Sequence, residues 1–499
     1  MIDKNFKLRT KHLKIDAGRN PIVFLNKYCP IVSKEGFEGM SRIKIFNEKK
    51  SVVAILNIVN SHIVMPEEIG LCDKAYKILD VENGDELQIS HLEPITSFAH
   101  VRAKMFGHPF TENGMFEIID DIVKGKYSDT HISSFSTACE GKNMNADETA
   151  YLTKAMVDTG DKISWGYDMI VDKHCIGGIP GNRTTAIVIP IVASFGMYIP
   201  KTSSRAITSP SGTADTMEVI APVDLDLDEM KKVVNKENGC LVWGGSVSLS
   251  PSDDMIIKVK RDLDIDSEGQ MIASIISKKI AAGSTHVLID IPTGPTAKVR
   301  TQTDAERLKK QFETIGKKLG IHIKAIITDG IQPIGNGIGP SLEATDIIGV
   351  LKNEKNAPKD LKEKSIILAG MILEFSPKVK AGQGAKLARE ILESGQAWNK
   401  FRAICDAQGG MRSIPYASHT YEVKAKKSGK VLAIDNRKLS KMAKLAGAPE
   451  SPTGGVYLYK HLKDTVKKDE IILTIHSESV GELHMALDLM DKFEIIKIG

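Results

Sequence analysis

The hexapeptide Lys-His-Cys-Ile-Gly-Gly at residues 173–178 follows an apolar run typical of a strand and precedes a helix expected to begin near Thr184. A glycine turn at such a position can present backbone N–H groups and a helix N-terminus to an anion, and Lys173 adds a positive charge. The same pattern also fits a plain turn with a surface lysine. The hexapeptide alone leaves phosphate binding and a structural turn equally open.

A second polar segment, Ser-Ser-Arg-Ala-Ile-Thr-Ser-Pro-Ser-Gly-Thr at residues 203–213, again lies between an expected strand and an expected helix. Its hydroxyls and the Arg205 guanidinium can donate several directed hydrogen bonds to a phosphorylated or polyhydroxylated ligand. The alternative is a polar loop whose Thr213 caps the next helix. Ligands of open α/β sheets bind at the carboxyl ends of strands, so two polar loops at such ends favour a binding site.

A helix is expected after Gly269, where Ile272 and Ile276 share one face and Ser274 and Lys278 lie together on the opposite face. A polar helix face of this kind is either solvated or directed at a ligand. On spacing alone, solvation is the simpler interpretation.

Three further features could carry chemistry. Asp262, Asp264 and Asp266 alternate along an expected extended or loop segment, but no calcium-loop spacing follows, so no metal site is predicted. Lys298 follows another strand and a Gly-Pro turn, from which it could reach an anion. Of the 13 histidines, only His174 lies within a candidate site.

The elements that must position these residues predict a mixed α/β fold. Short β-rich segments separated by turns come first, helical spacing follows, and strands then alternate with helices before a β-rich tail. The expected parts are an N-terminal β-rich, barrel-like domain at 1–95, a small discontinuous helical domain at 100–165 and 253–283, and a large α/β phosphate-binding domain at 166–252 and 284–499, β-rich from about 410.

Composition excludes several functional classes. The 499 residues include 67 basic and 63 acidic side chains, and the net charge of +4 does not predict a nucleic-acid-binding surface. No apolar run is long enough for a membrane span, and no secretory signal pattern opens the chain. The six cysteines are widely spaced, which fits reduced thiols and a cytoplasmic location.

Taken in order, three motifs resemble the thymidine/pyrimidine-nucleoside phosphorylase family: DKHCIGG, then SSRAITSPSGTADTMEVI, then ASIISKKIAAG. The resemblance extends from about residue 105 to the C-terminus. It implies an enzyme without a cofactor that transfers a pentosyl group to inorganic phosphate.

Departures from the pyrimidine enzymes narrow the resemblance. Cys175 replaces a serine, the loop IPGNR before Thr184 is longer, ITSPS replaces a run containing glycine and histidine, and the β-rich extension of about 95 residues is additional. These differences resemble the archaeal-type branch that acts on AMP. That branch implies cleavage of nucleoside 5′-monophosphates, chiefly AMP and also CMP and UMP, to the free base and ribose 1,5-bisphosphate.

The resemblance also implies residue roles. Asp266 matches the proton donor of that branch. Positions matching its nucleotide contacts are Gly178, Ser204, Arg205, Ala206, Ile207, Thr208, Ser209, Thr213, Ser274 and Lys298. In the pyrimidine enzymes, positions matching Lys173, Ser204 and Thr213 hold inorganic phosphate, and those matching Ser274 and Lys278 contact the base.

Phosphorolysis breaks an N-glycosidic bond through an oxocarbenium-like state, so phosphate must be held beside the sugar and the departing base neutralised. An aspartate with the ordinary pKa of roughly 3.9 is almost wholly ionised at pH 7, so burial or a neighbour such as Asp264 must raise the pKa of Asp266. His174, whose ordinary pKa is roughly 6.5, is the rival acid and needs less adjustment.

Three alternatives remain. A thymidine/pyrimidine-nucleoside phosphorylase would act without the 5′-phosphate. A phosphoribosyltransferase of related fold would require a pyrophosphorylated ribose and normally magnesium, for which no acidic motif lies beside the glycine loop. A binding or assembly module without catalysis is disfavoured by the retained Lys173, Arg205, Asp266, Ser274 and Lys298.

The N-terminal segment 1–95 carries none of the residues assigned to chemistry. Its short strands, including SVVAILNIV, have edges or faces that must be shielded from solvent. Contact between subunits is one way to bury these edges or faces. We therefore expect a homodimer, or a larger homo-oligomer assembled through this domain, with AMP and inorganic phosphate as the small-molecule partners.

Overall fold

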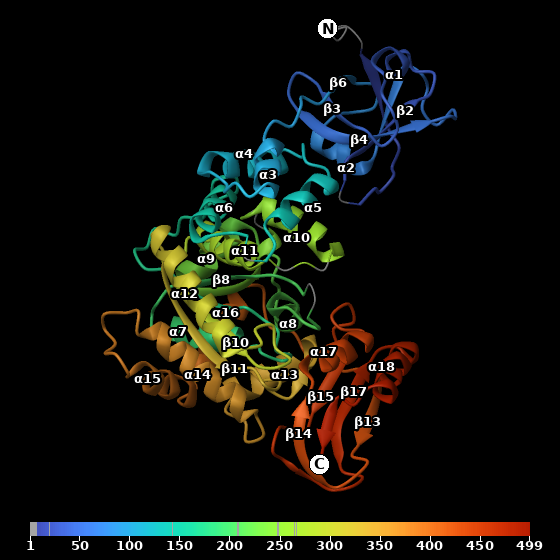
Figure 1. The fold of residues 1–499 in the computed structure, drawn as a ribbon. Helices are drawn as coiled ribbons and strands as arrows, with labels where there is room; N and C mark the ends of the chain where they lie inside the picture. The colour runs from blue at the N-terminus through green and yellow to red at the C-terminus, as the bar shows by residue number, and fades with distance from the viewer. Residues whose placement is uncertain are drawn as a thin grey trace. The chain divides into compact units, whose positions relative to one another are not determined.

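The computed structural model of the chain describes residues 7–18, 20–141, 143–206, 209–246, 249–263, 265 and 267–499. The chain forms two compact units, the first comprising Met1–Ala138 with Met255–Ile265 and the second comprising Cys139–Asp254 with Asp266–Gly499. Most elements of each unit are labelled in Figure 1, and the colour bar places the others by residue number.

The first unit begins with a closed barrel in the strand order β1-β5-β2-β4-β3-β6. Alternation along the strands directs side chains such as Leu25, Ile43 and Ile45 into a core where they are fully buried. Closure gives each of these strands a neighbour on both sides, so of the edges or faces expected to need cover only exposed faces remain. The barrel strands are β1 (Leu8–His12), β2 (Ile22–Asn26), β3 (Arg42–Phe46), β4 (Ser51–Val59), β5 (Glu68–Leu71) and β6 (Glu86–His91).

Helices complete the first unit. Arg42, on barrel strand β3, donates hydrogen bonds to the carbonyl oxygens of Gly125 and Tyr127, and so ties the barrel to the helical segment. The last helix, α10, begins in the second unit and continues into the first. The helices are α1 (Pro30–Glu35), α2 (Asp73–Leu79), α3 (Phe98–Met105), α4 (Glu112–Val123), α5 (Asp129–Ala138) and α10 (Pro251–Leu263).

The second unit is built on parallel strands. One sheet has the order β11-β10-β7 and another pairs β8 with β9, and an isolated parallel bridge between Ile170 and Tyr198 continues the order from β7 to β8. The chain adds β8 and β9 on one side of β7 and then β10 and β11 on the other. The winding therefore reverses between β7 and β10. The strands are β7 (Val171–Cys175), β8 (Ile199–Ser203), β9 (Gly239–Trp243), β10 (His286–Thr293) and β11 (His322–Asp329).

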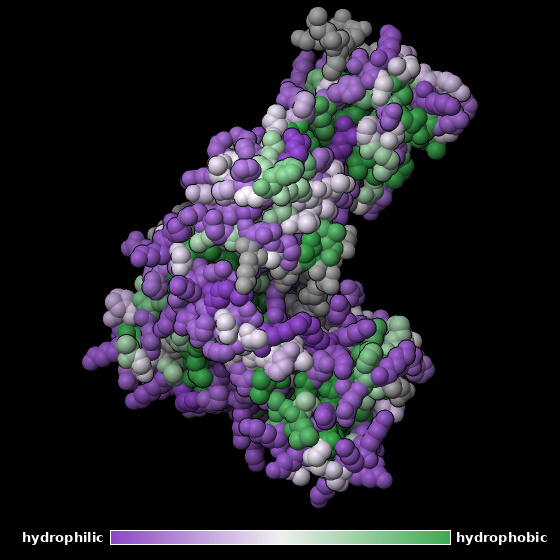
Figure 2. All heavy atoms as spheres, in the orientation of Figure 1, coloured by the Kyte–Doolittle hydropathy of each residue, from purple (hydrophilic) through white to green (hydrophobic). Residues whose placement is uncertain are grey.

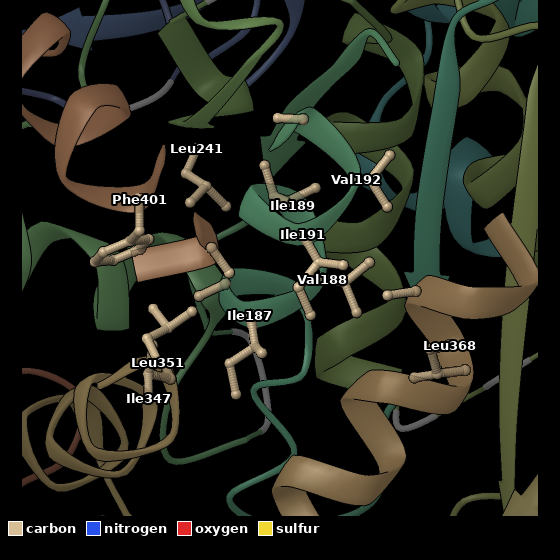
Figure 3. Packing of buried hydrophobic residues seen from close by; sticks show 14 of the residues in the cluster. Ile187, Val188, Ile189, Ile191, Val192, Leu241, Ile347, Leu351, Leu368 and Phe401 are labelled. Carbon is tan, nitrogen blue, oxygen red and sulfur yellow. The ribbon is translucent and has the colours of Figure 1, made fainter. Parts of the chain in front are cut away.

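The core of this unit surrounds α7, which is apolar on all sides because it is buried on all sides. Figure 3 shows Ile187 and Val188 of α7 among side chains from neighbouring helices, including Ile347, Leu368 and Phe401. The helices are α6 (Ala146–Asp158), α7 (Thr185–Ser194), α8 (Thr213–Ile220), α9 (Leu227–Glu237), α11 (Glu268–Ala281), α12 (Gln302–Lys318), α13 (Pro340–Leu351), α14 (Lys359–Leu373), α15 (Gly384–Glu393) and α16 (Gln396–Ala407).

The β-rich C-terminal part has its own core, formed by two sheets in the orders β12-β15-β17-β13 and β16-β14-β18. Strand β12 comes from the α/β part and pairs with β15, which joins the two parts. The elements are β12 (Gly337–Ile338), β13 (His419–Lys424), β14 (Gly429–Ile434), α17 (Asn436–Leu445), β15 (Gly455–Leu458), β16 (Thr465–Val466), β17 (Ile471–Ser477), α18 (Val480–Lys492) and β18 (Ile496–Ile498).

The architecture confirms the predicted fold class: a mixed α/β protein with helical segments and an N-terminal β-barrel. Across the described part of the chain, no helix is both long and apolar enough to cross a membrane.

Candidate functional site

The candidate site lies where the winding of the parallel strands reverses. In open α/β folds this switch point leaves a crevice at the carboxyl ends of the strands, and ligands bind there. The loop after β7 contains the double glycine, and the loop after β10 contains Lys298. Gly178 has a φ of +91°, and a Cβ on it would lie 2.5 Å from the Lys298 backbone nitrogen. The two loops therefore meet at this switch point, where only glycine fits at position 178.

Lys173, in β7, is fully buried beneath the glycine loop. Its ammonium group donates hydrogen bonds to Thr184 Oγ1 at 2.6 Å and to Thr185 Oγ1 at 3.4 Å, at the start of α7. Burial lowers the pKa of Lys173. The cation, the two hydroxyls and the beginning of α7 together form a setting suited to an anion, and of these only the two hydroxyls were not anticipated from the sequence.

His174 is a poor candidate for the proton donor. Burial and then the charges of Lys279, Lys201 and Lys173 lower its pKa well below the ordinary value. Its imidazole is therefore neutral at pH 7, and the expectation that this residue is an acid needing little adjustment is wrong. A neutral imidazole can still hydrogen-bond to a ligand.

Two of the lysines near His174 pair with one buried carboxylate. Asp172 forms ion pairs with Lys201 at 3.1 Å and with Lys279 at 2.6 Å, so β7, β8 and α11 are joined beneath the site. Burial lowers the pKa of Lys201 to about 7, and the two lysines overcome burial to lower the pKa of Asp172. Charged residues inside apolar strand segments were the sequence pattern that could have revealed this cluster.

Asp215, in the first turn of α8, joins two points of the second loop by hydrogen bonds. Its Oδ2 accepts hydrogen bonds from the backbone N–H groups of Ala206 and Gly212, each at 2.7 Å. Gly212, rather than Thr213, is the N-cap of α8, and a Cβ on Gly212 would lie 2.6 Å from the Ala206 nitrogen. Ser204 and Ala206 are therefore brought beside Thr213.

Ser209 lies in the same loop and donates a hydrogen bond to the carbonyl oxygen of Ser211 at 2.9 Å. The predicted contacts Ile207 and Thr208 lie outside the described residues.

Arg205 projects from this loop and is held by Glu218, Trp243 and Asp215, whose Oδ1 lies 3.5 Å from Nη1 of Arg205. Its guanidinium forms a two-pronged pair with Glu218, in which Nη2 lies 2.9 Å from Oε1, and it stacks 5.0 Å from the ring centre of Trp243. The Arg205 side chain is 37% exposed, so an anion from solvent can reach it. Because Glu218 fills the fork that a phosphate would use, a ligand that binds there must displace or share that carboxylate.

Ser274 and Lys278 share one face of α11, as the spacing predicts, while Ile272 and Ile276 are buried. Both polar side chains converge on Asp253 Oδ2, Ser274 at 2.8 Å and Lys278 at 2.6 Å. Burial lowers the pKa of Lys278, but the charge and hydrogen bond of Asp253 raise it by more, so the net shift is upward. The face is directed at a buried carboxylate rather than only at solvent.

The predicted residues thus form two groups. One contains Lys173, His174, Gly178 and Lys298, to which α11 adds Lys278, whose charge acts on His174, and Ser274, which shares Asp253 with Lys278. The other contains the described residues of the 204–213 loop. Asp264 and the predicted proton donor Asp266 lie outside the described residues, and Asp262 belongs to α10 rather than to an extended segment.

Within the part of the chain that the structure describes, no three His, Cys, Asp or Glu side chains converge as a set of metal ligands.

Two segments of the chain match models of a known protein family. Residues 99–160 match the helical bundle domain of a glycosyl transferase family, and residues 167–398 match its a/b domain. The crystal structure of anthranilate phosphoribosyltransferase from Thermus thermophilus resembles the chain with a TM-score of 0.51 at 16% identity, covering 62% of this chain and 99% of that one. This likeness concerns the fold alone.

Full-length relatives are more similar. A protein from Legionella pneumophila (strain Philadelphia 1) named "Putative thymidine phosphorylase" is 53% identical over 99% of this chain and 95% of its own length. A protein of the same name from Polaromonas sp. (strain JS666) is 48% identical over 97% of this chain and 94% of its own length. The chain is a member of the nucleoside phosphorylase family of pentosyl-transferring glycosyl transferases.

Proposed function

We propose that this enzyme catalyses the reversible phosphorolysis of nucleoside 5′-monophosphates, chiefly AMP and also CMP and UMP, in the cytoplasm and without a cofactor. The products are the free base and ribose 1,5-bisphosphate. The observation that carries the proposal is the presence of two separate anion-suited loops at strand ends. One is built on Lys173 and the start of α7, and the other on Arg205 and the start of α8. Two such loops suit a substrate pair that brings two phosphates.

In the proposed reaction, an oxygen of inorganic phosphate forms a bond to C1′ as the C1′–N bond breaks, and the electron pair leaves with the base. Lys173 stabilises the attacking phosphate, while Ser274 and Lys278 orient the base. Asp266 gives the departing base its proton. The remaining contacts to the nucleotide come from Gly178, Ser204, Arg205, Ala206, Ile207, Thr208, Ser209, Thr213 and Lys298. Fixed donors that meet the developing charge lower the barrier without reorganising.

A second candidate function is thymidine phosphorolysis, which would need no 5′-phosphate. The names of the relatives from Legionella and Polaromonas favour it, since they match along nearly the whole chain, including the barrel.

A comparison of substrates separates the two candidates. We expect kcat/KM for AMP to exceed that for adenosine and thymidine by at least about tenfold, because the charged contacts to the 5′-phosphate are lost with nucleosides. Release of base at saturating inorganic phosphate, measured for AMP, CMP, UMP, adenosine and thymidine, tests this expectation. Equal turnover of AMP and adenosine, or preferred turnover of thymidine, would contradict the nucleotide assignment.

We further propose that the barrel joins homodimers into larger particles. The described strands of the closed barrel have no open edge to cover, but the barrel exposes large apolar side chains, with Tyr28 71%, Met40 72% and Ile63 58% accessible. Figure 2 shows hydrophobic residues on the visible face of the barrel. Exposed apolar surface of this kind is typical of contact sites.

Replacing Tyr28, Met40 and Ile63 together by serine should reduce the particle mass measured by light scattering to that of a dimer, with phosphorolysis retained. An unchanged mass would contradict the role of this surface.

A further inference from the structure

Arg183 connects the two loops of the candidate site, although the sequence assigns it no role beyond its place at the end of the IPGNR loop. It lies at the end of the glycine loop, one residue before Thr184, to which Lys173 donates its hydrogen bond. Its guanidinium donates through Nη2 to the carbonyl oxygen of Ser211, in the second loop, and through Nε to Glu343 Oε2, on α13. A single side chain therefore ties both loops to α13.

The ion pair between Arg183 and Glu343 is buried. The Glu343 side chain is fully buried and that of Arg183 is 14% exposed, so the pair is largely shielded from solvent. Glu343 Oε1 also accepts a hydrogen bond from the Gly339 backbone at 3.2 Å. Burial raises the pKa of Glu343, and the positive charge of Arg183 opposes this effect. The ionised form of Glu343 is therefore stabilised by the Arg183 guanidinium.

Backbone contacts reinforce the same junction. The Ile334 N–H donates to the carbonyl oxygen of Pro180, and a Cβ on Gly181 would lie 2.5 Å from the Ile334 carbonyl oxygen. The glycine loop is thus fixed against the segment before α13. In contrast, the second loop is reached by Arg183 through one hydrogen bond to Ser211.

We propose that Arg183 is a positioning residue that sets the separation of the two anion-binding loops, and hence the alignment of the inorganic phosphate with the sugar-bearing substrate. The proposal rests on the proposed assignment of anions to these loops, but not on whether the substrate carries a 5′-phosphate. Glu343 is the fixed anchor, and Ser211 is the point at which the second loop is held.

Three variants separate positioning from simple support of the fold. Arg183→Met removes both connections and leaves the buried Glu343 carboxylate unpaired, so we expect a lower melting temperature and a KM for phosphate raised by about tenfold or more. The double variant Arg183→Met with Glu343→Gln removes the unpaired charge. It should regain most of the melting temperature while its KM for phosphate stays raised. Arg183→Lys cannot donate to both partners in the same geometry and should give an intermediate KM.

Arg389→Met is the matched control, because Arg389 makes a two-pronged pair with Glu363 at an exposed position. Its KM for phosphate should equal that of the unaltered enzyme. Added guanidinium ion should lower the raised KM of Arg183→Met and leave the control unchanged.

The assay uses whichever nucleoside or nucleotide the unaltered enzyme cleaves best, so failure of the AMP assignment leaves the test of Arg183 intact. Two results would overturn the positioning role. One is a double variant whose KM for phosphate returns to normal together with its melting temperature. The other is an Arg183→Met enzyme with an unchanged KM for phosphate.

Discussion

Replacing Asp266 by Asn should lower kcat by about 10²-fold or more while the melting temperature stays unchanged. Asparagine keeps the size and polarity of the side chain but cannot give a proton to the departing base. The residue is assigned through the resemblance to the AMP-cleaving branch. The rival His174 is disfavoured because burial and the charges of four lysines lower its pKa well below the ordinary value.

The pH dependence of the unaltered enzyme provides a second check. A histidine acid with an ordinary pKa would lose its proton, and the enzyme its activity, as the pH rises through roughly 6.5. Because the pKa of His174 is lowered, its charged form is already absent there, and we expect kcat to show no loss of activity assignable to His174 near that pH.

Asp228→Asn, an exposed change on α9, is the matched control and should keep full activity. Near-normal turnover of Asp266→Asn together with loss of turnover in His174→Ala would show that the proton donor was assigned to the wrong residue.

Replacing Lys173 by Met should lower kcat/KM for inorganic phosphate by roughly 10²- to 10³-fold, the range found when one preorganised donor to a developing charge is removed. Methionine nearly preserves the length and volume of the buried side chain. It leaves Thr184 and Thr185 without the ammonium group that joins them in the structure. The loss should therefore appear in phosphate use rather than in folding.

The Lys173→Met variant should lose activity without losing thermal stability. Burial lowers the pKa of Lys173, so the charged lysine is destabilising in the ligand-free enzyme, and Lys173→Met should melt at the same temperature or higher. Lys400→Met removes a different lysine, on α16, which pairs with Glu237 of α9 at 2.9 Å, and this change should leave phosphate use unchanged. A Lys173→Met enzyme with normal kcat/KM for phosphate would contradict the assignment of this loop.

Local patterns in the sequence were sufficient to predict several elements. The start of α7 near Thr184, the strand before each loop and the shared face of Ser274 and Lys278 all follow from spacing and turn residues. The domain boundaries and the site residues remain predictions.

Contacts between distant segments could not be predicted in this way. Asp253 meets Ser274 and Lys278 from another helix, and Glu343 meets Arg183 across 160 residues of sequence. Spacing within one element carries no information about its neighbours. Closure of the barrel depends equally on pairing between strands far apart in the chain, such as β1 with β5 and β6, so the sequence predicted a barrel-like domain but left open whether edges or faces of its strands would need cover.

Phosphorus NMR of the enzyme incubated with AMP and inorganic phosphate tests the central proposal most directly. We expect the AMP and inorganic phosphate signals to decline together as two signals of ribose 1,5-bisphosphate grow, one from the phosphate at C1′ and one from that at C5′. Free adenine should appear in equal amount, and no product should form when inorganic phosphate is omitted. Adenine release without phosphate, or a sugar product with a single phosphate, would contradict phosphorolysis of a nucleoside 5′-monophosphate.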